Sequence, residues 1–524
     1  MIKNKEFDVM VYGATPGGVA SAVTAARLGR NVALVEYHHH IGGMSASGLG
    51  KSDVALIQSS HGKSVIGALF KEFGSRIYKY YQSQYEPGSE DLKLCRNGYY
   101  YEPSVAEKIF REMIDDTGKI TLFTGHTLDS VSVKNQTLKS IYIRNRDNDT
   151  ISKISSKIFI DASYEGDLYS MAGADYYTGR EARKDFYEPH AGVIFYDYEN
   201  GIILPESTGE ADDGLQAYTY RYCFTRDRDN GQKLNTEPPD YDRRLYTPYF
   251  EDLRAGRLSA PKVFHEGWGY YPEHFDTLLR ALSVTDLPNM KVDANTNPRP
   301  LAFPFPEENK GYIEGDDTVR TRICERHKNI ALGLIWFLQN DHEVPDKQRE
   351  MANQYYFPLD EFTDNGNFPF QLYVREARRL KGEYIMTQHD VSITDEAPEV
   401  IRHHDTIAMG DFPIDSFPVS KKASHSGIVL EGYLGMLDHI AQAYEIPYRA
   451  MIPTTLDGII VPVALSATHV AFSSIRMEPT WMSLGEAAGV AAHVCIENHQ
   501  SPRNASVETI RSILEKQGQV LSVD

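Results

Sequence analysis

The chain has 524 residues, a formal net charge of −19 at pH 7 and 41% hydrophobic residues. This length favours two domains with substantial cores. The acidic balance disfavours a nucleic-acid partner, because phosphates would be repelled over most of the surface. The sequence also lacks an apolar run of roughly eighteen residues, so we expect no membrane span.

The first predicted element is a β-strand at residues 7–12, and only a short polar segment precedes it. That segment lacks the hydrophobic character of a signal peptide, so we expect a cytoplasmic protein, or a periplasmic one if a signal has been removed. The cysteines are scattered and show neither a redox nor a metal-ligand spacing. We therefore expect free thiols and no metal site.

The strand runs into a glycine-rich turn, a helix of small residues and a second strand that ends at Glu36. This order is typical of dinucleotide binding, because the helix N-terminus attracts a pyrophosphate and the acidic residue accepts hydrogen bonds from ribose. Thr15 stands where the middle glycine of the usual motif belongs, and its hydroxyl can donate to a phosphate. The alternative is an ordinary βαβ unit. The turn residues assigned to the cofactor are Gly13, Thr15, Pro16, Gly17 and Gly18.

The rest of the chain divides into regions that differ in composition and periodicity. A loop rich in glycine and serine at 38–48 should pass close to a ligand. Helices are predicted at 65–81, 103–113, 318–340 and 480–496, and β segments at 120–123, 128–134, 138–144, 151–160 and 458–465. We expect an α/β fold, in which residues 1–175 and 445–524 form a Rossmann-like nucleotide-binding domain and residues 176–444 form an inserted α+β substrate or cap domain.

Several motifs together resemble one family. They are the 13–18 turn with Glu36, Ile41-Gly42-Gly43-Met44, Asp161-Ala162-Ser163, Tyr373-Val374-Arg375-Glu376-Ala377-Arg378-Arg379, Ser466-Ala467-Thr468-His469, Arg476-Met477-Glu478-Pro479 and Gly485-Glu486-Ala487-Ala488-Gly489. Over nearly the whole chain they resemble the FAD-dependent oxidoreductases common in bacterial polysaccharide-degradation loci, some of which are labelled xanthan lyase. The order of segments is more distantly similar to that of fumarate reductase and succinate dehydrogenase flavoproteins.

The resemblance implies FAD as the cofactor. It implies that Gly13, Gly17, Gly18 and Glu36 hold the adenosine diphosphate half, that Gly42, Gly43 and Met44 run beside the flavin, and that Asp161 and Ala162 lie near the cofactor. The N-terminal dipole of the 480–496 helix would point at the flavin, with backbone donors at Ser483, Leu484 and Gly485. Because no second glycine fingerprint marks an NAD(P)H domain, we expect direct hydride exchange with an organic substrate.

Hydride transfer requires an acid or base, a cation for the substrate oxygen and a shielded cavity. We assign His469 as the acid or base, Arg476 as the oxygen or carboxylate clamp and Glu478 as the group that orients one of them. The alternative is a structural ion pair between Arg476 and Glu478.

A second group of candidates lies in the middle of the chain. We expect residues 373–379 to form a helix on which Arg375 and Arg379 share a face that suits an anionic substrate. A salt-bridge lattice between domains is the alternative. His389 is a third substrate-binding candidate, or else a structural histidine.

We therefore expect an FAD enzyme that oxidises an alcohol, or reduces the matching ketone or alkene, on a small polar molecule. The many tyrosines and the family's loci favour a sugar or sugar acid. Reduction of unsaturated carboxylates is the alternative among enzymes, and a tRNA-modifying or non-catalytic flavin-binding protein is the alternative outside them. The sequence leaves open the electron acceptor, a homo-oligomeric state and the part played by the histidines at 38–40: metal ligands, a covalent flavin link or a plain loop.

Overall fold

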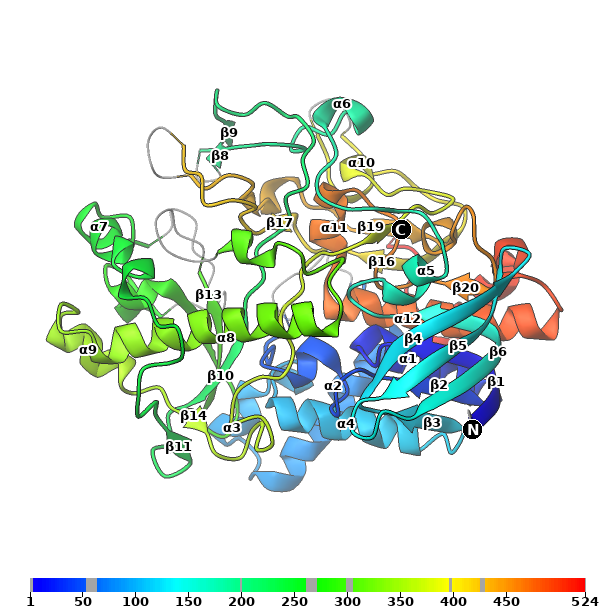
Figure 1. Cartoon of the computed structure of the whole chain (residues 1–524), viewed down its shortest axis with the longest axis horizontal. Helices are drawn as coiled ribbons and strands as arrows, with labels where there is room; N and C mark the ends of the chain where they lie inside the picture. Colours follow the sequence, from blue (N-terminus) through cyan, green and yellow to red (C-terminus); the bar gives the residue numbers. More distant parts are fainter. Residues whose placement is uncertain are drawn as a thin grey trace.

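The computed structural model describes residues 3–52, 64–197, 200–260, 271–297, 305–394, 398–424 and 429–523. Its largest sheet has seven strands in the order β3-β2-β1-β6-β5-β4, with β20 also paired to β6. These strands are β1 (Lys3–Tyr12), β2 (Val32–Val35), β3 (Ile120–Phe123), β4 (His126–Lys134), β5 (Thr137–Asn145), β6 (Ile151–Asp161) and β20 (Ile459–Ile460). The sheet occupies the lower right of Figure 1.

The strand β6 joins two kinds of pairing within this sheet. Its first half pairs antiparallel with β5, and its last residues pair parallel with β20 from the C-terminal part of the chain. On its other side β6 pairs parallel with β1, which in turn pairs parallel with β2. The two ends of the chain therefore contribute strands to one sheet, as the sequence predicted.

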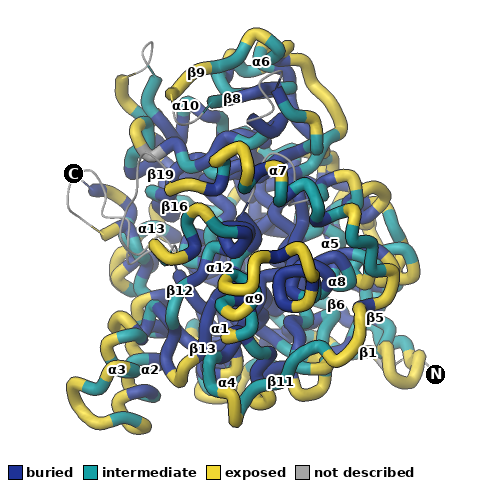
Figure 2. The backbone as a smooth tube through the Cα atoms, turned by 90° about the vertical axis from the view of Figure 1, so that its left-hand side faces the viewer, coloured by how far each residue is buried: buried dark blue, intermediate teal, exposed yellow. Residues whose placement is uncertain are grey.

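The helices α1 (Pro16–Arg27) and α12 (Glu478–Glu497) pack along each other. Small residues allow their backbones to approach closely: a Cβ atom on Gly485 would overlap the carbonyl oxygen of Gly17, and one on Gly489 would lie 2.6 Å from that of Ser21. Almost every residue of both helices is buried, and Figure 2 shows them in the interior. The N-terminus of each helix is thereby directed at a buried region of the molecule.

A second, three-stranded antiparallel sheet lies at some distance from the first (Figure 1). It consists of β10 (Tyr222–Thr225), β13 (Lys291–Thr296) and β12 (Leu282–Asp286). The long helix α8 (Asp317–Asn340) crosses in front of it and buries Ile330, Leu334 and Phe337 on one face. One apolar cluster runs continuously from β1 and α12 to α8.

A third region connects these two. Here β16 (Thr406–Gly410) pairs antiparallel with β19 (Tyr444–Pro447) and packs against α12. The remaining helices are α2 (Ala68–Gln84), α3 (Glu90–Leu94), α4 (Pro103–Asp115), α5 (Asp167–Met171), α6 (Arg183–Phe186), α7 (Pro248–Arg254), α9 (Asp346–Ala352), α10 (Gln388–Val391), α11 (His469–Ile475) and α13 (Val507–Gln517). The remaining strands are β7 (Tyr176–Tyr177), β8 (Tyr196–Asp197), β9 (Ile202–Ile203), β11 (Gly231–Gln232), β14 (Phe357–Pro358), β15 (Arg379–Leu380), β17 (Asp415–Ser416) and β18 (Gly435–Met436).

Most predicted elements are confirmed to within a few residues, including every strand up to residue 160 and the helices at 65–81, 103–113, 318–340 and 480–496. The four cysteines are free thiols, as expected. The β-rich stretch at 458–465 is wrong in extent, because only β20 pairs in the sheet. Pro462 lies two residues after the end of β20 and has no N–H to donate to a ladder.

The helix predicted at 373–379 is wrong. Residues 374–378 belong to neither a helix nor a strand, and Arg379 begins the short strand β15. Each guanidinium has a different buried partner: Arg375 donates to the carbonyl of Ala217, and Arg379 pairs with the carboxylate of Glu181. These tertiary contacts override the helical spacing on which the prediction rested.

Candidate active site

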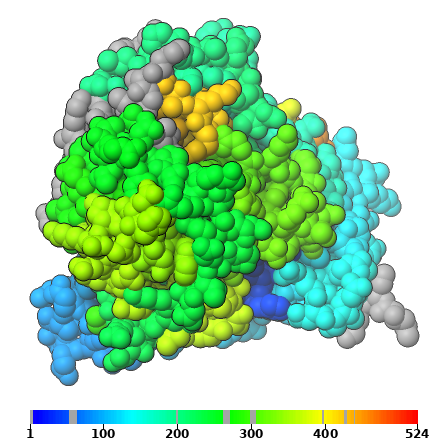
Figure 3. All heavy atoms as spheres, turned by 60° about the vertical axis from the view of Figure 1, so that its left-hand side comes forward, coloured from blue at the N-terminus to red at the C-terminus, as the bar shows by residue number. Residues whose placement is uncertain are grey.

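A cleft of about 380 Å³ opens at the carboxyl ends of β1 and β2. Ligands of open α/β sheets bind at this edge. Its walls include Gly13 and Thr15 from the glycine turn, Glu36 after β2, Thr127 of β4 and Arg320 of α8. In Figure 3 blue atoms of the N-terminal part of the chain lie between the green region that contains α8 and the cyan region that contains β4 and β5.

The glycine turn is held by its own side chains and backbone. Gly13 has φ +93°, and a Cβ atom on it would lie 2.7 Å from the backbone nitrogen of Ser163. The Thr15 hydroxyl, which we expected to donate to a phosphate, donates to the carbonyl of Ala162 (2.8 Å) and accepts from the N–H of Gly18 (3.2 Å). It does so because Thr15 is the N-cap of α1.

The Glu36 carboxylate is placed to accept hydrogen bonds from a ribose. It accepts the backbone N–H groups of Ala14 (2.7 Å) and His38 (2.9 Å). A carboxylate has about four acceptor positions, so these two bonds orient the group and leave others for ribose hydroxyls. Burial raises the pKa of Glu36 to about 7.

These features fit the adenosine diphosphate half of FAD. The first N–H groups of α1 have no partner within the helix, and the helix dipole favours an anion at this end. Pro16, in the first turn, has no N–H to lose, and Gly17 follows it. Asp161 is fully buried and accepts from the backbone N–H of Ser163 (3.0 Å). It thereby holds Ala162 and Ser163 against Gly13 and shapes the cleft from behind.

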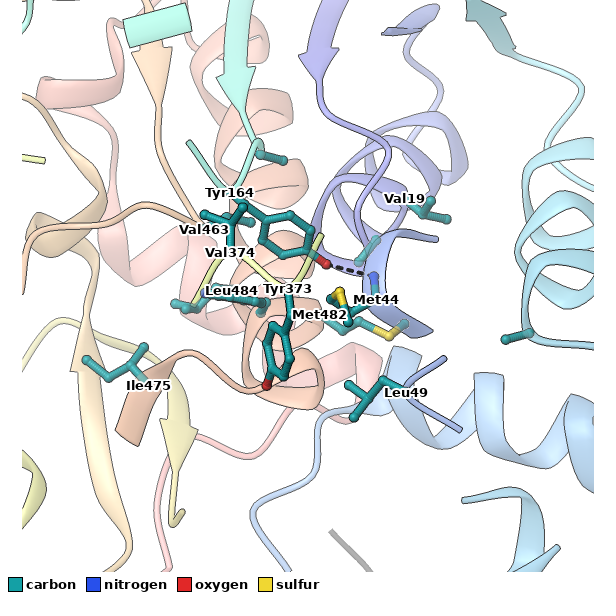
Figure 4. Close-up of a cluster of buried hydrophobic side chains, with 14 of the residues drawn as sticks. Val19, Met44, Leu49, Tyr164, Tyr373, Val374, Val463, Ile475, Met482 and Leu484 are labelled. Atoms are coloured by element: carbon teal, nitrogen blue, oxygen red, sulfur yellow. Dashed lines mark hydrogen bonds between the residues drawn. The ribbon is translucent and has the colours of Figure 1, made fainter. Parts of the chain in front are cut away.

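The loop after Glu36 leads to the second half of the site. Gly42 has φ +95°, and Gly43 and Met44 form the first turn of a short 3₁₀ helix (Gly43–Ala46). The N–H of Met44 donates to the hydroxyl of Tyr164 at 3.1 Å, a bond drawn in Figure 4. The Tyr164 hydroxyl in turn donates to Glu478 Oε1 at 2.7 Å, so one phenol connects this loop to the start of α12.

A cavity of about 50 Å³ lies at the start of α12. Apolar residues such as Leu49 and Phe412 form part of its wall. The titratable residues in its wall come from five separate segments, and they are Lys51, Tyr101, Tyr373, Asp411, Arg476 and Glu478. Several ionisable groups that converge on one cavity make it a candidate active site.

Arg476 presents its guanidinium to this cavity. One terminal nitrogen donates to the Tyr373 hydroxyl (3.2 Å), and the other donates to the backbone carbonyl of Asp415 (2.6 Å) and lies 3.6 Å from its carboxylate. Its Nε atom is buried and has no hydrogen-bond partner among the described residues. The ion pair with Glu478, which was the alternative to a catalytic role, is not among the ion pairs of the described residues.

Glu478 is the first residue of α12 and is 6% exposed. Burial raises the pKa of its carboxyl to about 8, so the group is mostly protonated at neutral pH. In the described part of the chain, neither Glu478 Oε2 nor the buried Trp481 Nε1 has a hydrogen-bond partner. Buried polar atoms are nearly always satisfied, so these atoms and Arg476 Nε indicate that a polar group binds at this helix end.

The arrangement fits a flavin ring with its polar edge at α12. Because α12 begins at Glu478, the N–H groups without a partner in the helix are those of Glu478 and Thr480. Ser483 lies one turn further and lines the cavity, Leu484 is fully buried, and Gly485 packs on α1. The free donors of this helix are thus nearer its start than the sequence suggested.

His469 is not among the residues that line the cavity. It is 4% exposed, with Nδ1 2.7 Å from Glu376 Oε2 and Nε2 3.3 Å from the hydroxyl of Ser416. The other oxygen of Glu376 lies 2.8 Å from Arg379 Nε. The histidine therefore belongs to a buried ionic network behind the cavity.

The other proposed substrate residues are placed differently from one another. Arg379 belongs to the ionic network just described, and His389 Nε2 lies 3.3 Å from the carbonyl of Phe186; neither lines the cavity. Arg375 is fully buried directly behind Tyr373, with its guanidinium 4.2 Å from that ring and 3.6 Å from the ring of Phe417.

The charge of Arg375 is unusual because no carboxylate of the described chain forms an ion pair with it, and burial lowers its pKa to about 9. Its Nη1 atom donates to the carbonyl of Ala217 at 2.7 Å, but its Nε atom is buried and has no partner in the described part of the molecule. The structure thus brings Arg476, Glu478 and, through Tyr373, Arg375 together at one cavity.

Sequence reasoning missed Tyr164, Tyr373, Lys51 and Asp411. The helix expected there hid Tyr373, because residues two apart do not face each other on a helix, yet the Arg375 guanidinium lies 4.2 Å from the Tyr373 ring. Lys51 directly follows the glycine loop. No sequence motif around Asp411 indicates a site. The residue reaches the cavity only because β16, which it follows, packs on α12.

The comparisons with known proteins identify the family. The family model described as FAD dependent oxidoreductase matches residues 8–514. The chain belongs to this family. The oxidoreductase is therefore an enzyme whose cofactor is FAD. A search of curated proteins finds no match.

Several solved flavoproteins are similar to this oxidoreductase. A geranylgeranyl bacteriochlorophyll reductase-like protein from Thermoplasma acidophilum is 12% identical, with 98% of this chain and 83% of that chain covered and a TM-score of 0.37. A variant of E. coli quinol fumarate reductase is 11% identical, with 99% of this chain and 74% of that chain covered and a TM-score of 0.34. The L-proline dehydrogenase from P. horikoshii is 16% identical over 35% of this chain, with a TM-score of 0.18, and the match spans only 26% of that chain.

Two further searches concern the residues that the structure describes. None of their helices is long and apolar enough to cross a membrane. They contain no group of three or more His, Cys, Asp or Glu side chains that could hold a metal ion. His40 lies between two carboxylates instead, with Nδ1 2.8 Å from Glu107 and Nε2 2.9 Å from Asp364.

Proposed function

We propose that the oxidoreductase transfers hydride between FAD and a sugar or sugar acid that binds at the start of α12, against the residues that line the cavity there. The observation that carries this proposal is the composition of that one cavity. Arg476 supplies a cation, Glu478 a protonated carboxyl, and Tyr101 and Tyr373 supply aromatic faces with hydroxyl groups. Such a wall suits a ring that bears several hydroxyls, because aromatic faces and hydrogen-bonding groups alternate along it.

Each group has a proposed task. Bound FAD supplies the two-electron oxidant or reductant. Arg476 binds the substrate oxygen or carboxylate and stabilises the negative charge that develops there. The protonated Glu478 donates to the same oxygen, and the Tyr164 hydroxyl fixes the carboxyl that does so. His469 acts through Glu376, which it holds in place at the centre of the 373–379 segment.

The residues proposed for the cofactor follow from the same placement. The glycine turn and Glu36 receive the adenosine diphosphate, and the loop of Gly42, Gly43 and Met44 carries the cofactor from the cleft to the cavity. The likeness of the sequence to oxidoreductases of polysaccharide-degradation loci supports a carbohydrate substrate.

Anaerobic mixing of the FAD-loaded protein with D-glucose, D-galactose, D-glucuronate and D-galacturonate tests the proposal. We expect at least one sugar or sugar acid to bleach the flavin absorbance, and the Arg476→Gln variant to lose that response. Absence of bleaching with every member of the panel would contradict the proposed substrate class.

Reduction of an unsaturated carboxylate is a second candidate, favoured by Arg375. A buried guanidinium without a carboxylate partner, directly behind a residue of the cavity wall, raises the local affinity for an anion. In this case chemically reduced flavin should be reoxidised by enoates such as fumarate under anaerobic conditions, while the sugars leave oxidised flavin unchanged.

A further inference from the structure

Oxidation of an alcohol requires a group that accepts the hydroxyl proton, and the position of His469 leaves that task open. Both of its ring nitrogens have partners in the buried network, and it does not line the cavity. Glu478 is poorly suited as well, since one oxygen accepts the Tyr164 hydroxyl and the carboxyl is mostly protonated at neutral pH. A proton acceptor must therefore come from elsewhere in the cavity wall.

We propose that Asp411 is the base that takes the hydroxyl proton of the substrate, an inference that rests on the proposed alcohol oxidation. Asp411 directly follows β16, which packs on α12, and its side chain lines the cavity together with Arg476 and Glu478. It is half-buried. Within the described chain no residue forms a hydrogen bond or an ion pair with its carboxylate.

The other charged and titratable groups of the cavity support this assignment. Lys51 and Tyr101 come from one side of the cavity wall, and Tyr373, Arg476 and Glu478 complete it. Burial raises the pKa of the Tyr101 phenol far above neutrality, so the phenol keeps its proton.

Asp411 differs from these groups in its ionisation. Burial raises the pKa of its carboxyl to about 7, and Tyr444 lies close enough behind it to feel its charge. A base works best when its pKa lies near the working pH. Asp411 is then ionised in a large fraction of molecules and still basic enough to accept a proton.

In the proposed step the O–H bond of the alcohol breaks, and its proton passes to a carboxylate oxygen of Asp411. The adjacent C–H bond breaks, and its hydrogen leaves with both electrons to the oxidant, which is bound FAD. The C–O single bond becomes a C=O double bond, so the substrate loses two electrons and two hydrogens.

The Asp411→Asn variant tests the proposal with the sugar or sugar acid of the panel that reduces wild-type flavin. We expect reduction to be about 10²–10⁴-fold slower. The wild-type rate should rise with pH through about 7, as Asp411 ionises, and this rise should be absent in the variant. FAD affinity and melting temperature should match those of Asp346→Asn, a control on the exposed surface of α9. A variant that keeps the wild-type rise with pH would overturn the proposal.

If no sugar reduces the flavin, the proposed substrate class is contradicted. A second measurement then tests whether Asp411 ionises beside the flavin. The absorption spectrum of the FAD-loaded protein is recorded from pH 5 to pH 9. Because Glu478 also lines the cavity and has a pKa of about 8, the titration is made in the Glu478→Gln background. There we expect a transition near pH 7 that an added Asp411→Asn substitution removes and that an added Glu36→Gln substitution leaves, since Asp411 lines the cavity. A transition that persists in the Asp411→Asn, Glu478→Gln double variant would show that the Asp411 carboxyl does not ionise beside the flavin and would refute its role as the base.

Discussion

The cleft at β1 and the cavity at α12 are built on different principles. The cleft depends on backbone: glycines that approach other main-chain atoms, a helix end and one carboxylate, Glu36. The cavity depends on ionisable side chains that five separate segments bring together. The difference predicts that a single added methyl group in the cleft weakens FAD binding, whereas in the cavity changes of charge matter more than changes of volume.

Apart from Asp411→Asn, the largest effect should follow from Arg476→Gln. Loss of the cation that stabilises charge on the substrate oxygen should slow flavin reduction by about 10²–10³-fold. FAD affinity should change little, because the adenosine diphosphate half binds in the other region. Rapid-mixing absorbance measures the rate, with Arg511→Gln on the surface as the control. Equal losses of FAD affinity and of rate would show that the two regions are not separable.

The Gly18→Ala variant probes the cleft. A Cβ atom there would overlap the carbonyl oxygen of Gly13, so the turn must shift. Overpacking of this kind costs about 1–3 kcal/mol, which corresponds to about 5- to 150-fold weaker FAD binding if the strain falls on the binding turn. Fluorescence titration with FAD measures it. In the Gly118→Asn control the new side chain enters open space, and asparagine tolerates the positive φ; an equal effect there would contradict the account.

The Glu36→Gln variant should have a smaller effect, about tenfold weaker FAD binding. A hydrogen bond to a charged acceptor contributes about 1.5–3 kcal/mol, and the neutral glutamine oxygen still keeps about 0.5–1.5 kcal/mol. The pH dependence is more diagnostic. The pKa of Glu36 in the free protein is about 7, and ribose hydroxyls favour the ionised form. Wild-type affinity should therefore rise as the pH increases through about 7, while the affinity of the variant should be constant. Parallel curves for the two proteins would rule out contact between Glu36 and the ribose.

The smallest effect is expected for Tyr373→Phe, which removes the hydroxyl that accepts from Arg476 but keeps the ring between that residue and Arg375. One such bond contributes about 0.5–1.5 kcal/mol, so the rate of flavin reduction should fall by about 2- to 12-fold. The melting temperature should stay close to that of the wild type. A fall as large as that of Arg476→Gln would mean that the phenol itself takes part in the chemistry.

The cleft could be predicted from sequence because its determinants are local. The strand, turn and helix that hold Gly13 and Gly18 lie within about twenty residues, and their spacing alone specifies the geometry. The two ends of the chain were also recognised correctly, since the small residues of α12 indicate close packing before any partner is known.

The cavity could be predicted only in part, for a physical reason. Arg476 precedes α12 and Glu478 begins it, so the small-residue helix pointed to both as candidates, but Asp411 reaches them only through the packing of β16 on that helix. The irregular segment around Arg375 has buried partners far away in sequence, such as Ala217, which no local pattern reveals. The same holds for His469, whose spacing suggested catalysis although its partner Glu376 lies behind the cavity.

A crystal structure of the FAD-loaded protein would decide whether the cleft and the cavity are two halves of one cofactor site. We expect ribose hydroxyls on Glu36 and the flavin ring at the start of α12, with Glu478 Oε2 or Trp481 Nε1 bonded to the ring or to an adjacent substrate. A flavin ring bound away from α12, with those two atoms still unpaired, would contradict it.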